Sequence, residues 1–182
     1  HGVPMDLCIQ HHRPMSSHEP VASTASDLSG RYLTFRLSTE SYGIGVLAVQ
    51  EIIRITAITP VPQLPDHLRG VINLRGRIVP VVDLRRRFGL PAETDGERAC
   101  IIVVRIHTAT RGVVPMGLVV DAVEEVLTIA SGEIEPPPEF GCAVDVSFLR
   151  GLARVRGEVK ALLDIDRVLT GEQLDVTAAF AA

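Results

Sequence analysis

Six acidic residues could in principle supply a paired-carboxylate catalytic site: Glu51, Asp83, Asp121, Glu124, Glu125 and Asp164. Asp83 and Asp164 each stand between an apolar run and a short helical pattern, where an N-cap carboxylate accepts hydrogen bonds from backbone N–H groups. The sequence contains no phosphate-binding loop, GxSxG or HExxH motif. We therefore predict a protein that is not an enzyme. A small β-barrel hydrolase using Glu51 or Asp83 is the competing hypothesis.

Two other groups of residues have side chains suited to binding a partner protein. If Glu51 lies on a strand beside the turn at Arg75, the two can form an ion pair oriented by Asn73, because a planar guanidinium binds carboxylates well. This pair either only fixes the turn or also binds a partner. Phe140 follows three prolines and Glu139; an aromatic side chain on such a rigid loop either anchors an interface or packs into its own domain.

Composition excludes several classes of site. The net charge of −4 is opposite to the basic footprint of a nucleic-acid binder. The three cysteines lack the spacing of a metal site, so we predict no metal and no cofactor, and a reducing cytoplasmic setting. No apolar run is long enough to cross a bilayer. The one dense basic run, residues 85–87, is interpreted as a solvated helix face.

The elements that position these residues occur twice. Residues 68–88 read as a hairpin turning at Arg75 and Gly76, followed by a short helix that Asp83 caps and Gly89 ends. Residues 149–169 align with this stretch without a gap, and residues 49–55 align with 123–129. A repeat of this length indicates two duplicated folding units. Pro80 cannot donate a ladder hydrogen bond, which predicts a sheet edge or a bulge.

The pattern predicts an all-β protein of two small five-stranded barrels packed together, because closed barrels leave no sheet edges. Further strands are expected at residues 31–37, 42–48, 100–106 and 113–120, and a short helix near the C-terminus. The predicted organisation is a disordered leader (1–30), a first subdomain (31–92), a second subdomain (98–164), a C-terminal helix (164–174) and a frayed tail (175–182). The crevice between the barrels is the expected site for a partner segment.

Several motifs resemble the CheW family of bacterial chemotaxis coupling proteins: VQEI at residues 49–52, GVINLRGRIVPVVDLR at 70–85, GLVVDAVEEVL at 117–127 and PPPEF at 136–140. The resemblance covers residues 32–174. It implies two SH3-like β-barrels and a non-enzymatic adaptor, cytoplasmic and recruited to membrane-associated receptor arrays. Its implied partners are the cytoplasmic tip of methyl-accepting chemoreceptors and the regulatory domain of the histidine kinase CheA. An adaptor of another chemosensory pathway, controlling pili or gliding, is the alternative.

The resemblance also assigns roles by motif. The receptor side would comprise Val49, Glu51, Gly70, Asn73, Arg75 and Gly76. The second barrel would dock on the kinase, with Glu139 and Phe140 making a further contact. Only the first hairpin keeps the full motif, since Ala153 and Arg154 stand where it has Ile72 and Asn73.

Overall fold

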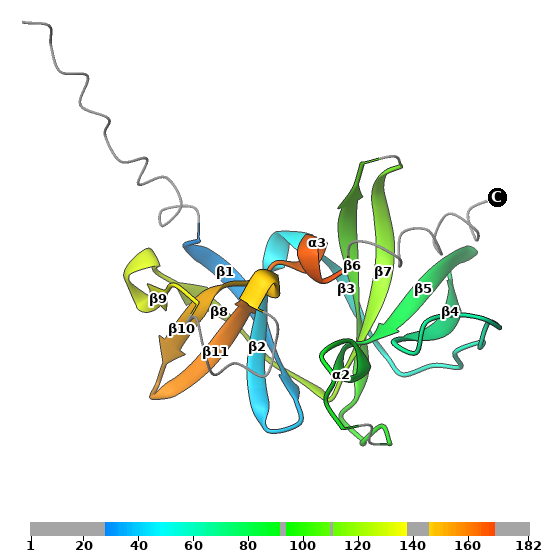
Figure 1. Cartoon of the computed structure of the whole chain (residues 1–182), viewed down its shortest axis with the longest axis horizontal. Helices are drawn as coiled ribbons and strands as arrows, with labels where there is room; N and C mark the ends of the chain where they lie inside the picture. Colours follow the sequence, from blue (N-terminus) through cyan, green and yellow to red (C-terminus); the bar gives the residue numbers. More distant parts are fainter. Residues whose placement is uncertain (1–27, 92–93, 110, 138–145, 170–182) are drawn as a thin grey trace, which may run out of the picture.

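The structure is a computed structural model that describes residues 28–91, 94–109, 111–137 and 146–169. Two β-bodies stand side by side in Figure 1, a six-stranded sheet on the left and a five-stranded sheet on the right. The predicted fold class, all-β with two SH3-like barrels, is confirmed. Residues 1–27 of the predicted leader, the predicted tail and the end of the predicted C-terminal helix lie outside the described residues, and the last residue of the predicted leader, Gly30, already belongs to a strand.

The six-stranded sheet has the order β8-β1-β2-β11-β10-β9. Its strands are β1 (Gly30–Leu37), β2 (Glu40–Gly45), β8 (Ala122–Ile129), β9 (Ile134–Glu135), β10 (Leu149–Val155) and β11 (Glu158–Leu163). The five-stranded sheet has the order β3-β6-β7-β5-β4. Its strands are β3 (Val49–Arg54), β4 (Leu68–Leu74), β5 (Arg77–Asp83), β6 (Cys100–Thr108) and β7 (Gly112–Val120).

Five short helices connect the strands of the described part: η1 (Val46–Ala48), α2 (Leu84–Arg87), η2 (Ser131–Glu133), η3 (Val146–Phe148) and α3 (Ile165–Val168). The strand predicted at 42–48 therefore gives way to a 3-10 turn at its end. Asp83 accepts hydrogen bonds from the N–H groups of Arg85 and Arg86, and Asp164 accepts one from Arg167 N–H. Both predicted N-caps are confirmed, and Gly89 follows α2 with the positive φ of 70° that a C′ residue adopts.

Strand pairing does not follow the predicted division into subdomains 31–92 and 98–164. The hairpin β1-β2 pairs with β8 and β11, whereas the hairpin β6-β7 pairs with β3 and β5. Each barrel thus combines a hairpin from one half of the chain with strands from the other half. The repeat indicated two units, but strand pairing across more than 70 residues leaves no local pattern in a sequence, so the exchange of hairpins was not foreseen.

Two equivalent glycines sit where each barrel closes. After β3 the chain returns along β4, and Thr59 and Val71 exchange two backbone hydrogen bonds of 2.9 and 3.0 Å. A Cβ on the neighbouring Gly70 would lie 2.0 Å from the Thr59 carbonyl oxygen. In the other barrel β9 pairs with β10, and a Cβ on Gly151 would lie 2.8 Å from the Glu135 carbonyl oxygen. Both positions need glycine because a second backbone passes directly over them.

Pro80 lies on an interior strand, because β5 pairs with both β4 and β7. The sheet-edge alternative is therefore wrong. Its partner in register, Val71, directs both backbone groups away from Pro80 toward Thr59, and pairing to β7 begins only at Val81. A bulge interrupts β4 between Leu68 and Gly70, next to this position. The missing N–H of Pro80 consequently removes no ladder hydrogen bond.

The largest apolar core lies between the barrels. It contains buried residues of both sheets, including Phe35 and Ile44 from one and Ile102, Val104 and Leu118 from the other. Neighbouring residues of β6 point the opposite way, and Ile101 and Val103 belong to the separate interior of the five-stranded barrel. Burial of this shared core stabilises both barrels at once, so they form one body.

Candidate docking surfaces

The turn between β4 and β5 holds an exposed ion pair, as predicted. Arg75 Nη1 lies 2.7 Å from Glu51 Oε2, and the arginine side chain is 76% exposed while the glutamate is 19% exposed. Arg75 and Gly76 both have positive φ, at 52° and 83°, the pattern of a tight two-residue hairpin. Gly76 N–H donates to Asn73 Oδ1 at 2.9 Å, so Asn73 fixes the turn from which Arg75 projects.

The other predicted receptor-side residues have different surroundings. A second backbone segment crosses close to Gly70, as described above, so the closure of the barrel explains why this residue is a glycine. Val49 begins β3 directly after η1 and packs partly buried against the shared core. Glu139 and Phe140 lie outside the described residues, so their predicted contact with the kinase stays a prediction.

The same surface recurs on the six-stranded barrel. Arg156 Nη1 lies 3.4 Å from Glu125 Oε1 at the turn between β10 and β11, the repeat equivalents of Arg75 and Glu51. Each ion pair has two exposed aliphatic side chains at equivalent positions, namely Ile52 and Ile78 on one barrel and Val126 and Val159 on the other. The second pair was missed in the sequence, although the repeat aligns both of its members.

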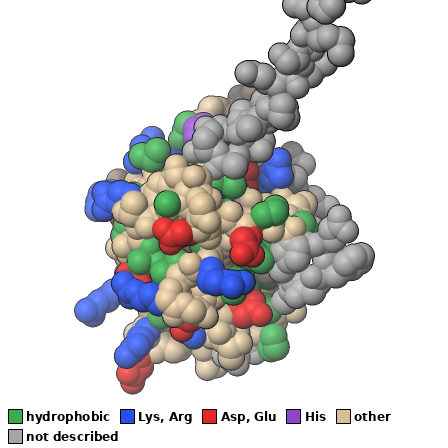
Figure 2. Space-filling model, turned by 90° about the vertical axis from the view of Figure 1, so that its left-hand side faces the viewer, with side chains coloured by type: hydrophobic (Ala, Val, Ile, Leu, Met, Phe, Trp, Pro, Cys, Tyr) green, Lys and Arg blue, Asp and Glu red, His purple; other side chains and the backbone are tan. Residues whose placement is uncertain are grey.

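Figure 2 views the molecule from the side of the six-stranded barrel. Hydrophobic side chains appear there as small separate areas among basic and acidic groups, with no broad apolar face in this view. Small scattered apolar areas are normal on protein surfaces, so apolar area alone does not mark this face as a docking site.

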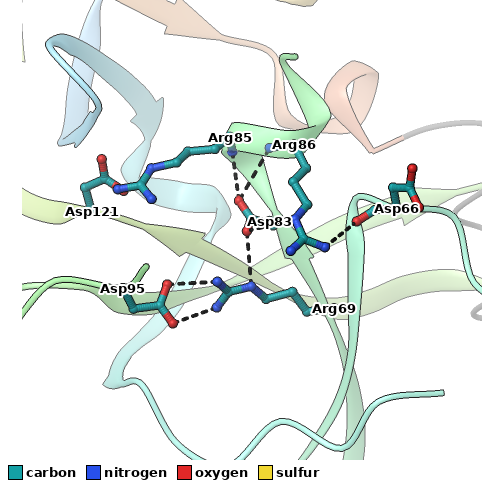
Figure 3. Close-up of polar contacts among 7 residues, drawn as sticks. All are labelled: Asp66, Arg69, Asp83, Arg85, Arg86, Asp95 and Asp121. Atoms are coloured by element: carbon teal, nitrogen blue, oxygen red, sulfur yellow. Dashed lines mark hydrogen bonds and ion pairs between the residues drawn. The ribbon is translucent and has the colours of Figure 1, made fainter. Parts of the chain in front are cut away.

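A second polar cluster surrounds α2 (Figure 3). Arg69 donates from Nε to Asp83 at 3.1 Å and makes a two-pronged contact with Asp95 at 2.8 and 2.9 Å. The hydrogen bonds from Arg69 hold the pKa of Asp95 below its ordinary value. Arg86 donates to the Asp66 carbonyl oxygen at 3.1 Å. The Asp83 carboxylate is thus occupied by helix capping and by Arg69, which argues against a catalytic role for it.

The interpretation of residues 85–87 as a solvated face is wrong for two of the three arginines. Arg85 is buried and pairs with Asp121, which also accepts a hydrogen bond from Ser38 N–H in the β1-β2 turn. Arg87 lies over the Phe148 ring at 4.8 Å and donates to the Val168 carbonyl oxygen at 2.9 Å. These arginines join the two barrels, which a local helical pattern could not indicate.

A groove of about 810 Å³ lies where the two barrels meet. Its walls come from the start of β1, η1, the β6-β7 hairpin, β10 and α3. Its apolar side chains include Val46, Leu47, Val113 and Ile165, and Leu47 is 96% exposed. The crevice expected between the barrels is therefore present, although most of their contact is filled by the shared core.

Among the described residues, no group of three or more His, Cys, Asp or Glu side chains could hold a metal ion. His107 Nδ1 lies 3.6 Å from Asp166 Oδ2 on the surface. No helix in the described ranges is long and apolar enough to span a membrane.

Comparison with known proteins agrees with this geometry. The CheW-like domain matches residues 31–173. The chain belongs to the CheW-like family. It is 36% identical over 157 residues to the chemotaxis protein CheW of Klebsiella aerogenes, covering 84% of this chain and 92% of that one. The similarity to the CheW scaffolding protein of Thermoanaerobacter tengcongensis extends to structure, with a TM-score of 0.71 and 33% identity over 80% of this chain and 96% of that one.

A further relative is protein FrzA of Myxococcus xanthus, 29% identical over 140 residues, or 76% of this chain and 84% of that protein. Members of the CheW-like family are non-enzymatic scaffolds. The predicted function is confirmed at this level: the protein is a chemotaxis adaptor and not an enzyme.

Proposed function

We propose that this adaptor couples the cytoplasmic tips of methyl-accepting chemoreceptors to the regulatory domain of the kinase CheA, on the cytoplasmic side of membrane-associated receptor arrays. The observation that carries the proposal is the exposed Arg75 and Glu51 pair on a turn held by Asn73. A guanidinium fixed in this way can exchange its intramolecular carboxylate for one on a partner with little loss of conformational entropy.

The receptor side of the proposal comprises the β4-β5 turn of the five-stranded barrel, the start of β3 and the groove beside them. The turn supplies Asn73, Arg75 and Gly76, and Glu51 lies across from it on β3. Val49 leads from η1, whose Leu47 projects into the groove. A helical hairpin laid along the groove would bury these exposed apolar groups, which is the usual mode of helix-in-groove recognition.

The kinase side of the proposal is the face of the six-stranded barrel around the β10-β11 turn. Its Arg156 and Glu125 pair and the exposed Val126 and Val159 repeat the chemistry of the first turn. Glu139 and Phe140 on the proline-rich loop would add an aromatic anchor. Two docking faces on one rigid body, joined by a shared apolar core, are what an adaptor needs to couple two partners. Such coupling typically amounts to about 1–3 kcal/mol.

The proposal is tested by calorimetric titration of the full chain against a CheA regulatory domain and, separately, against a cytoplasmic hairpin fragment of a chemoreceptor from the same genome. Wild type should bind both. Phe140→Ala should lose kinase affinity and keep receptor affinity. Failure of folded wild type to bind either partner would sink the proposal. Binding only to the kinase and receptors of a pili or gliding pathway would assign the protein to that array.

A further inference from the structure

The groove between the barrels has an uneven distribution of charge. Three arginines line it, Arg31, Arg105 and Arg150, whereas Asp166 is its single acidic side chain among the described residues. Asp166 is already engaged, because it accepts a hydrogen bond from His107 N–H at 3.0 Å and faces the His107 ring. The chain as a whole carries a net charge of −4, so this groove is basic on an acidic protein.

Two of the three arginines have side chains that form no ion pair or hydrogen bond with other described residues. Arg31 and Arg105 are exposed and have no ion-pair or hydrogen-bond partner for their side chains within the ranges that the structure describes. Arg150, by contrast, lies 3.8 Å from Asp164 and also interacts with the Tyr32 side chain. Arg69, Arg75, Arg85 and Arg86 all contact carboxylates as well.

We propose that Arg31 and Arg105 select an acidic partner segment: a helix whose apolar ridge enters the groove and whose flanking carboxylates meet these two guanidinium groups. This inference rests on the proposed function, since it names the chemistry of the receptor segment that the groove takes. Leu47 and Val113 give the groove its exposed apolar contacts, and the two arginines lie beside them on β1 and β6.

The arginines would act on specificity more than on total affinity. Charges at the rim of an interface steer approach and penalise partners of the wrong sign, and salt screens their contribution. Apolar contacts in the groove would bind many amphipathic helices alike. The two arginines would make this adaptor prefer acidic ones over neutral or basic ones.

The test compares the double variant Arg31→Glu/Arg105→Glu with a matched control, Arg54→Glu/Arg98→Glu. The control has the same change in charge, and its residues are exposed near the opposite end of β6, where Arg54 pairs in register with Cys100. Binding of the full-length variants to the receptor hairpin fragment and to the CheA regulatory domain is measured at low and at high salt.

We expect the groove variant to lose about tenfold or more in receptor affinity at low salt and clearly less at high salt, while kinase affinity stays within about twofold. The control should resemble wild type. A receptor fragment with its groove-facing acids changed to lysine should bind the groove variant better than it binds wild type.

Equal receptor binding by wild type and groove variant would overturn the inference while leaving the proposed function intact. The same holds if the control variant loses as much affinity as the groove variant, since the effect would then come from net charge alone. Wild type that binds neither partner would instead overturn the proposed function.

Discussion

The two barrels fill one equivalent pair of interior positions with side chains of opposite kinds, aliphatic in one and charged in the other. In the five-stranded barrel Ile72 and Val79 face each other across β4 and β5 and are both buried in an aliphatic interior. The equivalent pair in the six-stranded barrel is Ala153 and Lys160. Lys160 is nonetheless buried, with its side chain 4% exposed.

Lys160 can be buried because neighbouring polar side chains accept hydrogen bonds from its ammonium group. Its ammonium donates to Glu124 at 2.9 Å and Ser41 at 3.0 Å and lies 3.8 Å from Glu158. The small Ala153 opposite leaves room for the long side chain. A duplicated backbone can thus be filled either by aliphatic packing or by a buried ammonium group that is hydrogen-bonded and ion-paired, provided that the facing residue changes too.

The largest expected effect comes from the closing glycines. Gly70→Ala should destabilise the fold by more than about 3 kcal/mol, because its Cβ meets the Thr59 carbonyl at 2.0 Å and its φ of 144° is unfavourable for alanine. Gly151→Ala should cost less, since its nearest contacts are 2.7 and 2.8 Å. Urea denaturation of both variants measures the difference, and equal losses would contradict this ranking.

The second-largest effect tests the difference between the charged and the aliphatic barrel interior. Lys160→Met should cost about 2 kcal/mol, because Glu124 would keep its partly buried charge with one partner fewer. The matched variant Ala153→Ile/Lys160→Val/Glu124→Gln moves the other barrel's aliphatic pair into this position and removes the orphaned charge. Its unfolding free energy should lie closer to wild type; a larger loss than for the single variant would refute the comparison.

The pH dependence of stability should report the same network. Burial alone would raise the pKa of Glu124, but hydrogen bonds from Lys160 and Ser41 and the charges of Lys160 and Arg36 hold it below its ordinary value. A lowered folded-state pKa gives stability that is complete above the unfolded value and is lost as pH falls toward the folded one. Acid unfolding curves should therefore be steeper for wild type than for Lys160→Met.

Binding measurements can distinguish the roles of the two duplicated turns. Arg75→Glu should leave the fold intact because the side chain is exposed, and should weaken receptor binding about tenfold, or about 1.4 kcal/mol, because it removes the guanidinium group and leaves an acidic group facing Glu51 on β3. Arg156→Glu should instead weaken binding to the kinase regulatory domain. Thermal unfolding is the control, and unfolding of Arg75→Glu would mean that the pair only fixes its turn.

The smallest difference concerns two equivalent arginines at the start of β4 and β10. Arg69 contacts Asp83 at 3.1 Å and Asp95 through two hydrogen bonds, whereas Arg150 lies 3.8 Å from Asp164. Arg69→Met should cost about 1 kcal/mol and Arg150→Met less than about 0.5 kcal/mol in denaturant titrations. A reversed order would show that the contacts of Arg150 are the stronger ones.

Local features were predictable from the sequence, and distant pairings were not. The turns at Arg75 and Arg156, the caps at Asp83 and Asp164 and the ion pair to Glu51 each follow from residues near in sequence or aligned by the repeat. The pairing of β2 with β11 joins Ser41 to Lys160, and no local rule specifies it. Arg85 reads as a surface residue because its partner Asp121 lies 36 positions away.

The exchange of hairpins also determines the order in which the two barrels can fold during synthesis. Every strand of the five-stranded barrel lies within residues 49–120, whereas the six-stranded barrel needs β1 and β2 from before this stretch and β8 to β11 from after it. During synthesis the inner barrel can close while its outer partner still lacks most of its strands. The hairpin β1-β2 can lay its apolar face on the inner barrel through the shared core, but its outer edges gain their strand partners only when β8 and β11 have been made. In this adaptor the first hairpin made is built into its sheet by the last of the described strands.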